Sequence, residues 1–153
     1  MEPSNQISLI VPLLVGMAAI FCTVIIHGLI LRLVIYWVRR DLRLSRAGVT
    51  FWRDLLIVTA AMLLAVAGHL IEMGVWALTL ELCGEFSSFA AAFYHSAGCY
   101  TTLGGSGGVI SPRWRLLGPL EASDGMLMFG ITTAMIFAVV QRLLETRFAR
   151  SDA

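Results

Sequence analysis

Three stretches of the chain are almost continuous runs of apolar residues, and they cover residues 8–36, 55–80 and 125–144. A helix needs about 20 apolar residues to cross the roughly 30 Å of hydrocarbon in a bilayer, and each run reaches that length. We therefore predict three transmembrane helices. Each of them is long enough to tilt or to extend past the membrane.

A fourth apolar segment, Phe86 to Tyr100, has only 15 residues and is too short to span a membrane. Ser87 or Ser88 is placed to cap a short helix in this segment. The aromatic side chains of the segment fall roughly on one stripe of that helix. They are Phe86, Phe89, Phe93 and Tyr94.

The short predicted helix is followed by Thr101 and Thr102, then by a glycine-rich run from Gly104 to Gly108, and Pro112 ends the segment. A backbone without regular hydrogen bonds is tolerated at membrane depth only where protein buries it or where it lines a water-filled cavity. We therefore interpret the segment as a re-entrant half-helix with its loop. The alternative is an ordinary external loop rich in glycine and serine.

Composition narrows the class of protein. Hydrophobic residues make up 58% of the chain and charged residues 14%, which is typical of a membrane protein. The 11 basic residues, all arginine, nearly balance the 10 acidic ones, so the net charge of +1 indicates no nucleic-acid partner. The three scattered cysteines offer neither a disulfide framework nor a zinc site.

Catalytic chemistry has little support in the sequence. An integral membrane enzyme needs a nucleophile beside a base or a cluster of metal ligands, and His69 with Glu72 is weak evidence for either. We therefore expect no enzyme activity, no small-molecule substrate and no resident cofactor or metal.

The distribution of arginine predicts how the chain crosses the membrane. The connection 38–54 contains five arginines against two aspartates, and the C-terminal segment 141–153 contains three arginines against one glutamate and one aspartate. Both segments are predicted to be cytoplasmic. The N-terminus has Glu2 and no basic residue, so it is predicted to lie outside and not to be a cleaved signal peptide.

The order of these segments resembles the pore module of potassium channels, in which an outer helix, a pore helix, a Thr-x-Gly-Tyr-Gly-type filter and a glycine-containing inner helix follow one another. The residues that carry the resemblance are FYHSAGCYTTLG (Phe93 to Gly104), Pro112 and GMLMFGITTAMIFAVVQRL (Gly125 to Leu143). It covers about residues 55–145, and it is closest to small bacterial channels with two transmembrane helices, here with an additional N-terminal helix.

The resemblance implies an all-α integral membrane fold of three transmembrane helices, a re-entrant pore helix and a filter loop, assembled as a homotetramer in membrane lipid. It divides the chain into 1–52, an N-terminal transmembrane helix with a cytoplasmic linker, and 53–153, the pore module. It also implies the inner membrane of a bacterium as the location.

The resemblance further implies a filter from Thr101 to Gly107. Thr102, Leu103 and Gly104 match the first three filter positions, and Thr101 with Thr102 is expected to keep the lower part of the ion coordination. A permeant K⁺ or Na⁺ is expected to bind there.

The match then fails, because the family has Tyr, Gly and Asp where this chain has Gly105, Ser106 and Gly107. We therefore expect a wider or partly collapsed upper filter with weakened selectivity for K⁺.

Two pairs of polar residues interrupt the predicted helices. His69 and Glu72 are three residues apart and lie on one helical face, as do Glu121 and Asp124 if the third span begins soon after Pro112. A charge inside a membrane costs about 2.5 to 3.5 kcal/mol on insertion scales, so each acid needs a partner or a cavity.

Two interpretations of these acids stay open. In the first, Glu72, Glu121 or Asp124 braces the filter from behind by bonding its backbone or Tyr100, or adds negative potential near the ion path. In the second, His69 and Glu72 bond each other or a neighbouring helix, and the later two acids cap the inner helix. A metal site on His69 and Glu72 would need further ligands. In the first span, His27 and Arg32 are also polar, and Arg32 is expected to extend to the interface.

The third predicted span offers a pore lining. Thr133, Phe137 and Val140 are spaced four and three apart on one face, and Phe137 with Val140 is suited to an apolar constriction. Gly125 and Gly130 are places where the helix can bend or pack closely. The alternative for this stripe is plain helix packing.

External charges favour cations over anions, because Glu81, Glu85, Glu121 and Asp124 outnumber Arg113 and Arg115. The leading hypothesis is therefore a tetrameric channel that conducts K⁺ or monovalent cations. The alternative is a non-conducting, channel-like membrane protein with a regulatory or packing role.

Overall fold

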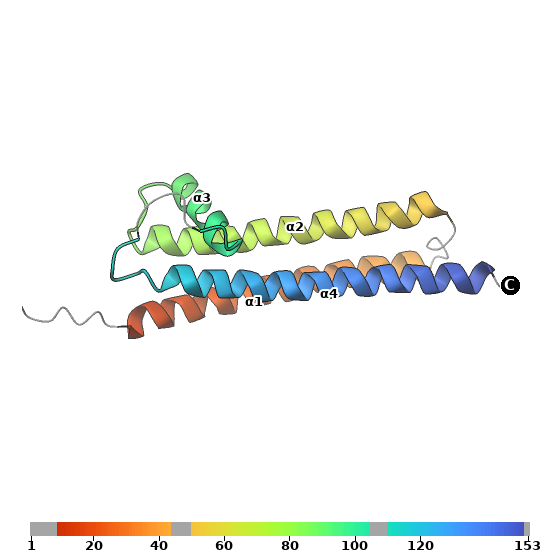
Figure 1. Ribbon diagram of the computed structural model, residues 1–153, viewed down its shortest axis with the longest axis horizontal. Helices are drawn as coiled ribbons and strands as arrows, with labels where there is room; N and C mark the ends of the chain where they lie inside the picture. The colour runs from red at the N-terminus through yellow and green to blue at the C-terminus, as the bar shows by residue number, and fades with distance from the viewer. Residues whose placement is uncertain (1–8, 44–49, 105–109, 152–153) are drawn as a thin grey trace, which may run out of the picture. The chain divides into compact units, whose positions relative to one another are not determined.

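The computed structural model describes residues 9–43, 50–104 and 110–151. Over these residues the chain forms four helices and no strand (Figure 1). They are α1 (Ile10–Arg43), α2 (Phe51–Leu82), α3 (Phe89–Tyr100) and α4 (Leu117–Ser151). The predicted all-α class is confirmed.

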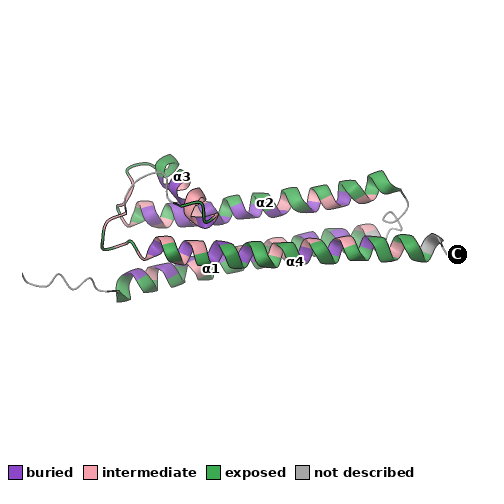
Figure 2. Cartoon of the chain, in the orientation of Figure 1, coloured by how far each residue is buried: buried purple, intermediate pink, exposed green. Residues whose placement is uncertain are grey.

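Three of the helices are long and apolar enough to cross a membrane, as the sequence predicts. The membrane-length stretches are Ile10–Asp41, Phe51–Leu82 and Leu117–Ala149. Large apolar side chains cover their outward faces, where Figure 2 shows mostly exposed residues. Such faces suit lipid rather than water, so the chain has the build of a multi-pass membrane protein.

The third of these helices begins earlier than its apolar run. α4 begins at Leu117, eight residues before the predicted start at residue 125. Pro119 lies in the first turn, where a proline does not interrupt the helical hydrogen bonds. Glu121 and Asp124 follow within the helix and are fully buried, so their polarity marks internal contacts and not the end of a span.

The short helix α3 lies where the sequence predicts a half-helix. Ser88 is its N-cap, and its hydroxyl accepts a hydrogen bond from the Ala91 N–H at 3.3 Å. After the helix, Thr102 has φ +62° and Gly104 has φ +94°. A positive φ is common for glycine but unusual for threonine, so the chain reverses sharply just after α3.

The chain forms two compact units, and each long helix contributes a part to both. Unit 1 contains the chain up to Ile25 together with Leu70–Leu127, and unit 2 contains Ile26–His69 together with the chain from Met128. Each unit takes segments from both sides of residue 52, and the division at 52/53 stays a prediction.

Unit 2 has an apolar core built from residues four apart on each helix. Its buried members are Val34 and Val38 of α1, Ile57, Ala61 and Ala65 of α2, and Met135, Val139 and Leu143 of α4. This spacing keeps one stripe of each helix inside. The alanines of α2 are small and allow close approach, as is typical of helix packing in membranes.

Unit 1 has a core that is polar as well as apolar. Trp76, Ala77 and Leu80 of α2 are fully buried, as are Ala92 of α3 and Leu117 of α4. Between them lie buried polar side chains of all four helices, and these form the candidate site.

Candidate functional site

Three carboxylates lie inside unit 1. Glu72 on α2 and Glu121 on α4 are 0% exposed, and Asp124 on α4 is 1% exposed. A buried carboxylate costs several kcal/mol unless donors surround it. Each of the three accepts a hydrogen bond from a side chain of another helix of the unit.

Glu72 is bonded to the end of α3. The Tyr100 hydroxyl donates to the Glu72 carboxylate, and Tyr100 is itself completely buried. Tyr100 is the last residue of α3 and directly precedes Thr101. The bond therefore ties α2 to the point where α3 passes into the glycine-rich loop.

Glu121 is bonded to the middle of α3. The Ser96 hydroxyl lies within hydrogen-bond distance of the Glu121 carboxylate and, at 2.9 Å, of the Met73 carbonyl oxygen. Ser96 is also 0% exposed. This one side chain therefore contacts both α2 and α4 and fixes the face that α3 turns toward them.

Asp124 joins α4 to two other helices of the unit, α1 and α2. Its Oδ2 accepts a hydrogen bond from the Thr23 hydroxyl of α1 at 2.8 Å and from Trp76 Nε1 of α2 at 2.9 Å. Thr23 and Trp76 are both 0% exposed. Within unit 1, a single carboxylate oxygen thus links three long helices.

Gly125 allows α4 to lie directly against the end of α3. A Cβ at this position would overlap the carbonyl oxygen of Tyr100 and lie within 2.9 Å of its carbonyl carbon. Gly130, by contrast, has nothing within 4 Å of its Cβ position. Of the two glycines for which the sequence suggests bending or close packing, Gly125 is the one in tight contact.

These contacts test the interpretation that Glu121 and Asp124 cap the start of α4. The first turn of α4 contains no acidic residue, so the interpretation of Glu121 and Asp124 as caps of this helix is wrong. They lie further along the helix and bind side chains of α1, α2 and α3. The structure brings Glu72 to Tyr100, while the bracing of a filter by these acids stays a prediction.

The residues predicted to form the filter begin at the end of α3. The Thr101 hydroxyl donates to the Ala97 carbonyl oxygen at 2.6 Å and so closes the last turn. Leu103 is 88% exposed, and the Gly104 N–H bonds back to the Gly98 carbonyl oxygen at 3.1 Å. Gly105, Ser106 and Gly107 lie outside the described residues.

A pair of hydrogen bonds fixes the two ends of the excursion that contains α3. Glu85, just after α2, accepts hydrogen bonds from the backbone N–H and the hydroxyl of Ser111, both at 2.7 Å. Ser111 directly precedes Pro112. The chain therefore leaves α2 and returns toward α4 at one point, which we call the Glu85–Ser111 latch.

The predicted pore-lining residues lie on an outward face of α4. Gly130, Thr133 and Phe137 are exposed, with Phe137 at 62%, and Val140 is half-buried. The Thr133 hydroxyl donates to the Phe129 carbonyl oxygen at 2.8 Å, within its own helix. The stripe is not part of the core of unit 2 and stays available to another molecule.

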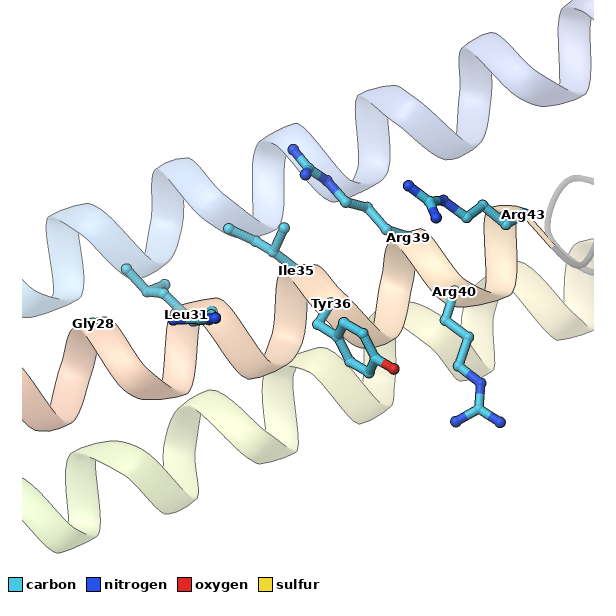
Figure 3. A pocket seen from close by; sticks show the side chains of 8 residues that line it. Gly28, Leu31, Ile35, Tyr36, Arg39, Arg40 and Arg43 are labelled. Atoms are coloured by element: carbon cyan, nitrogen blue, oxygen red, sulfur yellow. The ribbon is translucent and has the colours of Figure 1, made fainter.

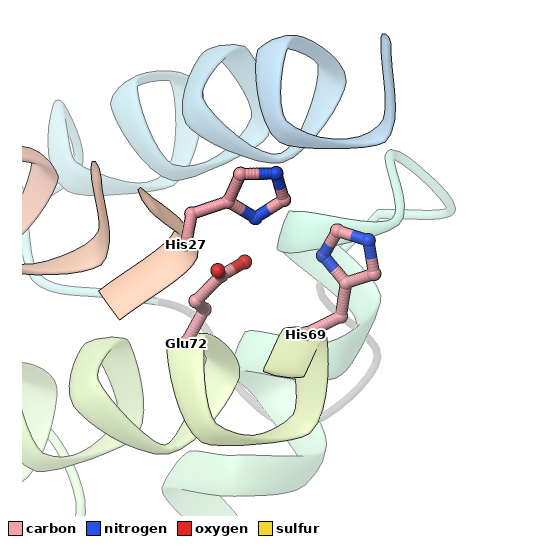
Figure 4. A group of neighbouring side chains, drawn as sticks. All are labelled: His27, His69 and Glu72. Atoms are coloured by element: carbon pink, nitrogen blue, oxygen red, sulfur yellow. The ribbon is translucent and has the colours of Figure 1, made fainter. Parts of the chain in front are cut away.

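Two buried histidines meet inside unit 2. His27 of α1 and His69 of α2 have ring centroids 5.5 Å apart, and both are labelled in Figure 4. The Thr132 hydroxyl oxygen of α4 lies 3.1 Å from Nε2 of His69 and 3.5 Å from Nε2 of His27. Thr132 thus gives both histidine rings a polar neighbour in a part of the unit that is otherwise apolar.

Sequence reasoning missed the partners of the acids. Thr23, Trp76 and Ser96 hold the carboxylates, and Thr132 lies beside the histidines. The only signal for them is that each carries a donor at an apolar helical face. Such residues need a partner inside a membrane, but their spacing does not say which one.

The Glu72 contact predicts different outcomes for two substitutions. Glu72→Gln keeps an oxygen that accepts the Tyr100 hydroxyl, whereas Glu72→Ala leaves that donor unsatisfied at about 1 to 3 kcal/mol. We expect Glu72→Ala to lower the thermal midpoint of the detergent-solubilised protein and Glu72→Gln to leave it nearly unchanged. Tyr100→Phe in the Glu72→Ala background removes the orphaned donor and should recover part of the loss.

If Glu72→Ala unfolds at the same temperature as the parent, Glu72 is a tolerated polar residue on a helix seam.

No family model matches the chain, and no curated protein and no solved structure is detectably similar to it.

Proposed function

We propose that the protein is a subunit of a cation channel and that four copies surround one pore formed by α3 and the residues that follow it. The observation that supports this most strongly is α3 itself. A helix of 12 residues lies between two helices of membrane length, and buried polar side chains hold it at its middle and at its end. An ordinary external loop has no need of such anchoring.

The electrostatics of this segment favour cations. The C-terminal end of a helix carries partial negative charge, and α3 directs its C-terminal end to Thr101 and the glycine-rich run. No residue from Phe86 to Gly108 has a charged side chain other than His95, if protonated. The buried carboxyl groups of Glu72 and Glu121 bond side chains of α3 and place polar oxygen atoms beside it.

The proposed assembly follows from what one chain supplies. A filter coordinates an ion with rings of oxygens, and a chain with one loop of this kind contributes only part of each ring. A closed symmetric assembly completes each ring of oxygens with copies of the same loop. Four-fold symmetry is the form implied by the resemblance to potassium channels. The exposed stripe of Gly130, Thr133 and Phe137 would then face the central pathway.

The test is ion flux through the purified protein in liposomes. We expect cation flux that depends on the protein and exceeds anion flux, together with cross-linked species up to four copies. A stable monomer or dimer in detergent would contradict the assembly. A tetramer without flux would instead support the second candidate, a non-conducting packing or regulatory partner.

The departure of the filter from the family pattern predicts a gain of selectivity. Restoring the family residues with Gly105→Tyr, Ser106→Gly and Gly107→Asp returns a packing side chain, backbone freedom and a carboxylate. We expect the triple variant to raise K⁺ over Na⁺ selectivity by about tenfold, which corresponds to about 1.4 kcal/mol. Reversal potentials under opposing K⁺ and Na⁺ gradients measure the change.

A matched control replaces the same positions with Phe, Ala and Asn, which restores bulk without the hydroxyl, the glycine or the charge. Equal reversal potentials for the parent and both variants would show that residues 105–107 do not set selectivity.

A further inference from the structure

An arginine-rich groove runs along α1 within unit 2. It is a cavity of about 770 Å³, and Figure 3 shows its lining side chains. Arg32, Arg39, Arg40 and Arg43 line it together with Gly28, Leu31, Ile35 and Tyr36. These residues recur at intervals of three and four, so they form one broad face of the helix.

A second cavity of about 710 Å³ continues this groove between α1 and α4. It shares Leu31, Ile35, Arg39 and Arg43 with the first. Its remaining walls are Val38 of α1 and the α4 residues Met135, Ala138, Val139 and Arg142. The continuous groove therefore has an apolar floor and a rim of five arginines.

The guanidinium groups of this rim are available to an external anion. Arg32, Arg39, Arg40 and Arg43 are exposed, and within the described parts of the chain none of them forms an ion pair. Arg142 is the exception, because it pairs with Glu145 at 3.1 Å. No acidic side chain lines either cavity. The positive charge of α1 is thus uncompensated by the groove itself.

A neighbouring groove at the same end of the membrane-length helices gives a natural comparison. It is lined by Arg147, but also by Asp54, and it has a volume of about 190 Å³. Arg147 lies over the ring of Phe51, 6.0 Å from its centroid. In this groove Asp54 balances the charge of Arg147, which already lies over an aromatic ring, so we expect Arg147 to bind an anion only weakly.

We propose that the groove along α1 is a binding site for an anionic phospholipid, with the phosphate of its headgroup on Arg39 and Arg43 and its acyl chains over Leu31, Ile35 and Val38. Guanidinium groups bind phosphate oxygens in bidentate geometry. Basic pockets between membrane helices, near the level of the headgroups, are suited to anionic lipids. Tyr36, which is 63% exposed, has the amphipathic ring that is favoured at this level.

The apolar floor distinguishes a lipid from a free anion. A soluble phosphate would use the arginines but leave the side chains of Leu31, Ile35, Met135 and Val139 without an occupant. Open space at Gly28, where nothing lies within 4 Å of the Cβ position, extends the floor away from the arginine end. This inference does not depend on ion conduction.

The experiment is a lipid titration of the full-length protein in detergent, with bound lipid counted by native mass spectrometry. Phosphatidylglycerol is the anionic probe, and phosphatidylcholine, which has the same phosphate but no net charge, is the comparison. The test variant is Arg39→Gln with Arg43→Gln. The control is Arg53→Gln with Arg147→Gln, which removes the same charge at the same end of these helices.

We expect the parent to bind phosphatidylglycerol in preference to phosphatidylcholine. The test variant should weaken the binding of phosphatidylglycerol about 30-fold, because each arginine near a membrane surface contributes about 1 kcal/mol. The control variant should stay within about threefold of the parent. The charge-preserving Arg39→Lys with Arg43→Lys should bind phosphatidylglycerol more weakly than the parent but more tightly than the test variant, because lysine keeps the charge and loses the bidentate geometry.

Three results would overturn the proposal. Equal weakening in the test and control variants would show a general surface-charge effect. Equal binding of both lipids would show that charge does not select the occupant. Displacement of phosphatidylglycerol by an equal concentration of inorganic phosphate would show a simple anion site. A lowered thermal midpoint would identify a misfolded test variant. In that case, the binding of phosphatidylglycerol is compared between Arg39→Lys with Arg43→Lys and Arg39→Lys with Arg43→Met, which differ by one positive charge.

Discussion

Gly125→Ala is expected to destabilise the protein, although alanine is a better helix former than glycine. The new Cβ would overlap the Tyr100 carbonyl oxygen, which is backbone and has no alternative rotamer. Overpacking of a tight contact costs about 1 to 3 kcal/mol and occasionally more, against a gain of about 1 kcal/mol in helix propensity. The net loss should appear as a lower thermal midpoint in detergent and as a displaced α3.

Gly130→Ala is the matched control, because it makes the same change five residues further along the same helix. Nothing lies within 4 Å of the Cβ position at Gly130, so only the gain in helix propensity remains. We expect this variant to be as stable as the parent or slightly more stable. Equal midpoints for the two alanine variants would show that α3 and α4 are not in close contact at Tyr100.

Asp124→Ala is expected to have an effect of similar size for a different reason. Trp76 Nε1 donates to Asp124, and it has no second acceptor in the part of the chain that the structure describes. The Thr23 hydroxyl, in contrast, also lies 2.8 Å from the Ile20 carbonyl oxygen. The loss should therefore be dominated by the orphaned indole, at about 1 to 3 kcal/mol, plus the cavity left by the side chain.

A double-mutant cycle isolates this contact. Asp124→Asn keeps an acceptor oxygen and should lose much less stability than Asp124→Ala. Trp76→Phe removes the donor, so in the Asp124→Ala background it should cost less than in the parent. Independent, additive effects of the two substitutions on the free energy of unfolding would show that the indole and the carboxylate do not interact.

The helices were predictable because the evidence for them is local. A run of about 20 apolar residues is a property of one segment. A serine before an apolar helix can likewise cap that helix independently of the rest of the chain. The start of α4 was not predictable in this way. Gly118, Pro119 and Glu121 are typical of a helix boundary when seen alone, and only their contacts with the rest of unit 1 show that the helix has already begun.

The partners of the buried acids depend on the tertiary fold. Thr23 and Asp124 are 101 residues apart, and Trp76 reaches the same carboxylate from another helix. The sequence correctly indicates that acids in apolar helices need partners, but many hydroxyl groups along the chain have the right chemistry. The expected depth of each hydroxyl group in the membrane narrows the choice of partner only roughly, because the tilt and rotation of each helix are set by packing.

The Glu85–Ser111 latch and the contacts of α3 together make the glycine-rich run between them a separable insertion. Tyr100 bonds Glu72 before the run and Ser111 bonds Glu85 after it, so the positions of its two ends do not require any particular sequence in between. Additional residues in a loop with fixed ends cost little free energy, because the entropy of loop closure grows only with the logarithm of the number of residues. The glycine-rich run can therefore be exchanged, lengthened or replaced by a segment from another protein, while α2 and α4 keep their present ends.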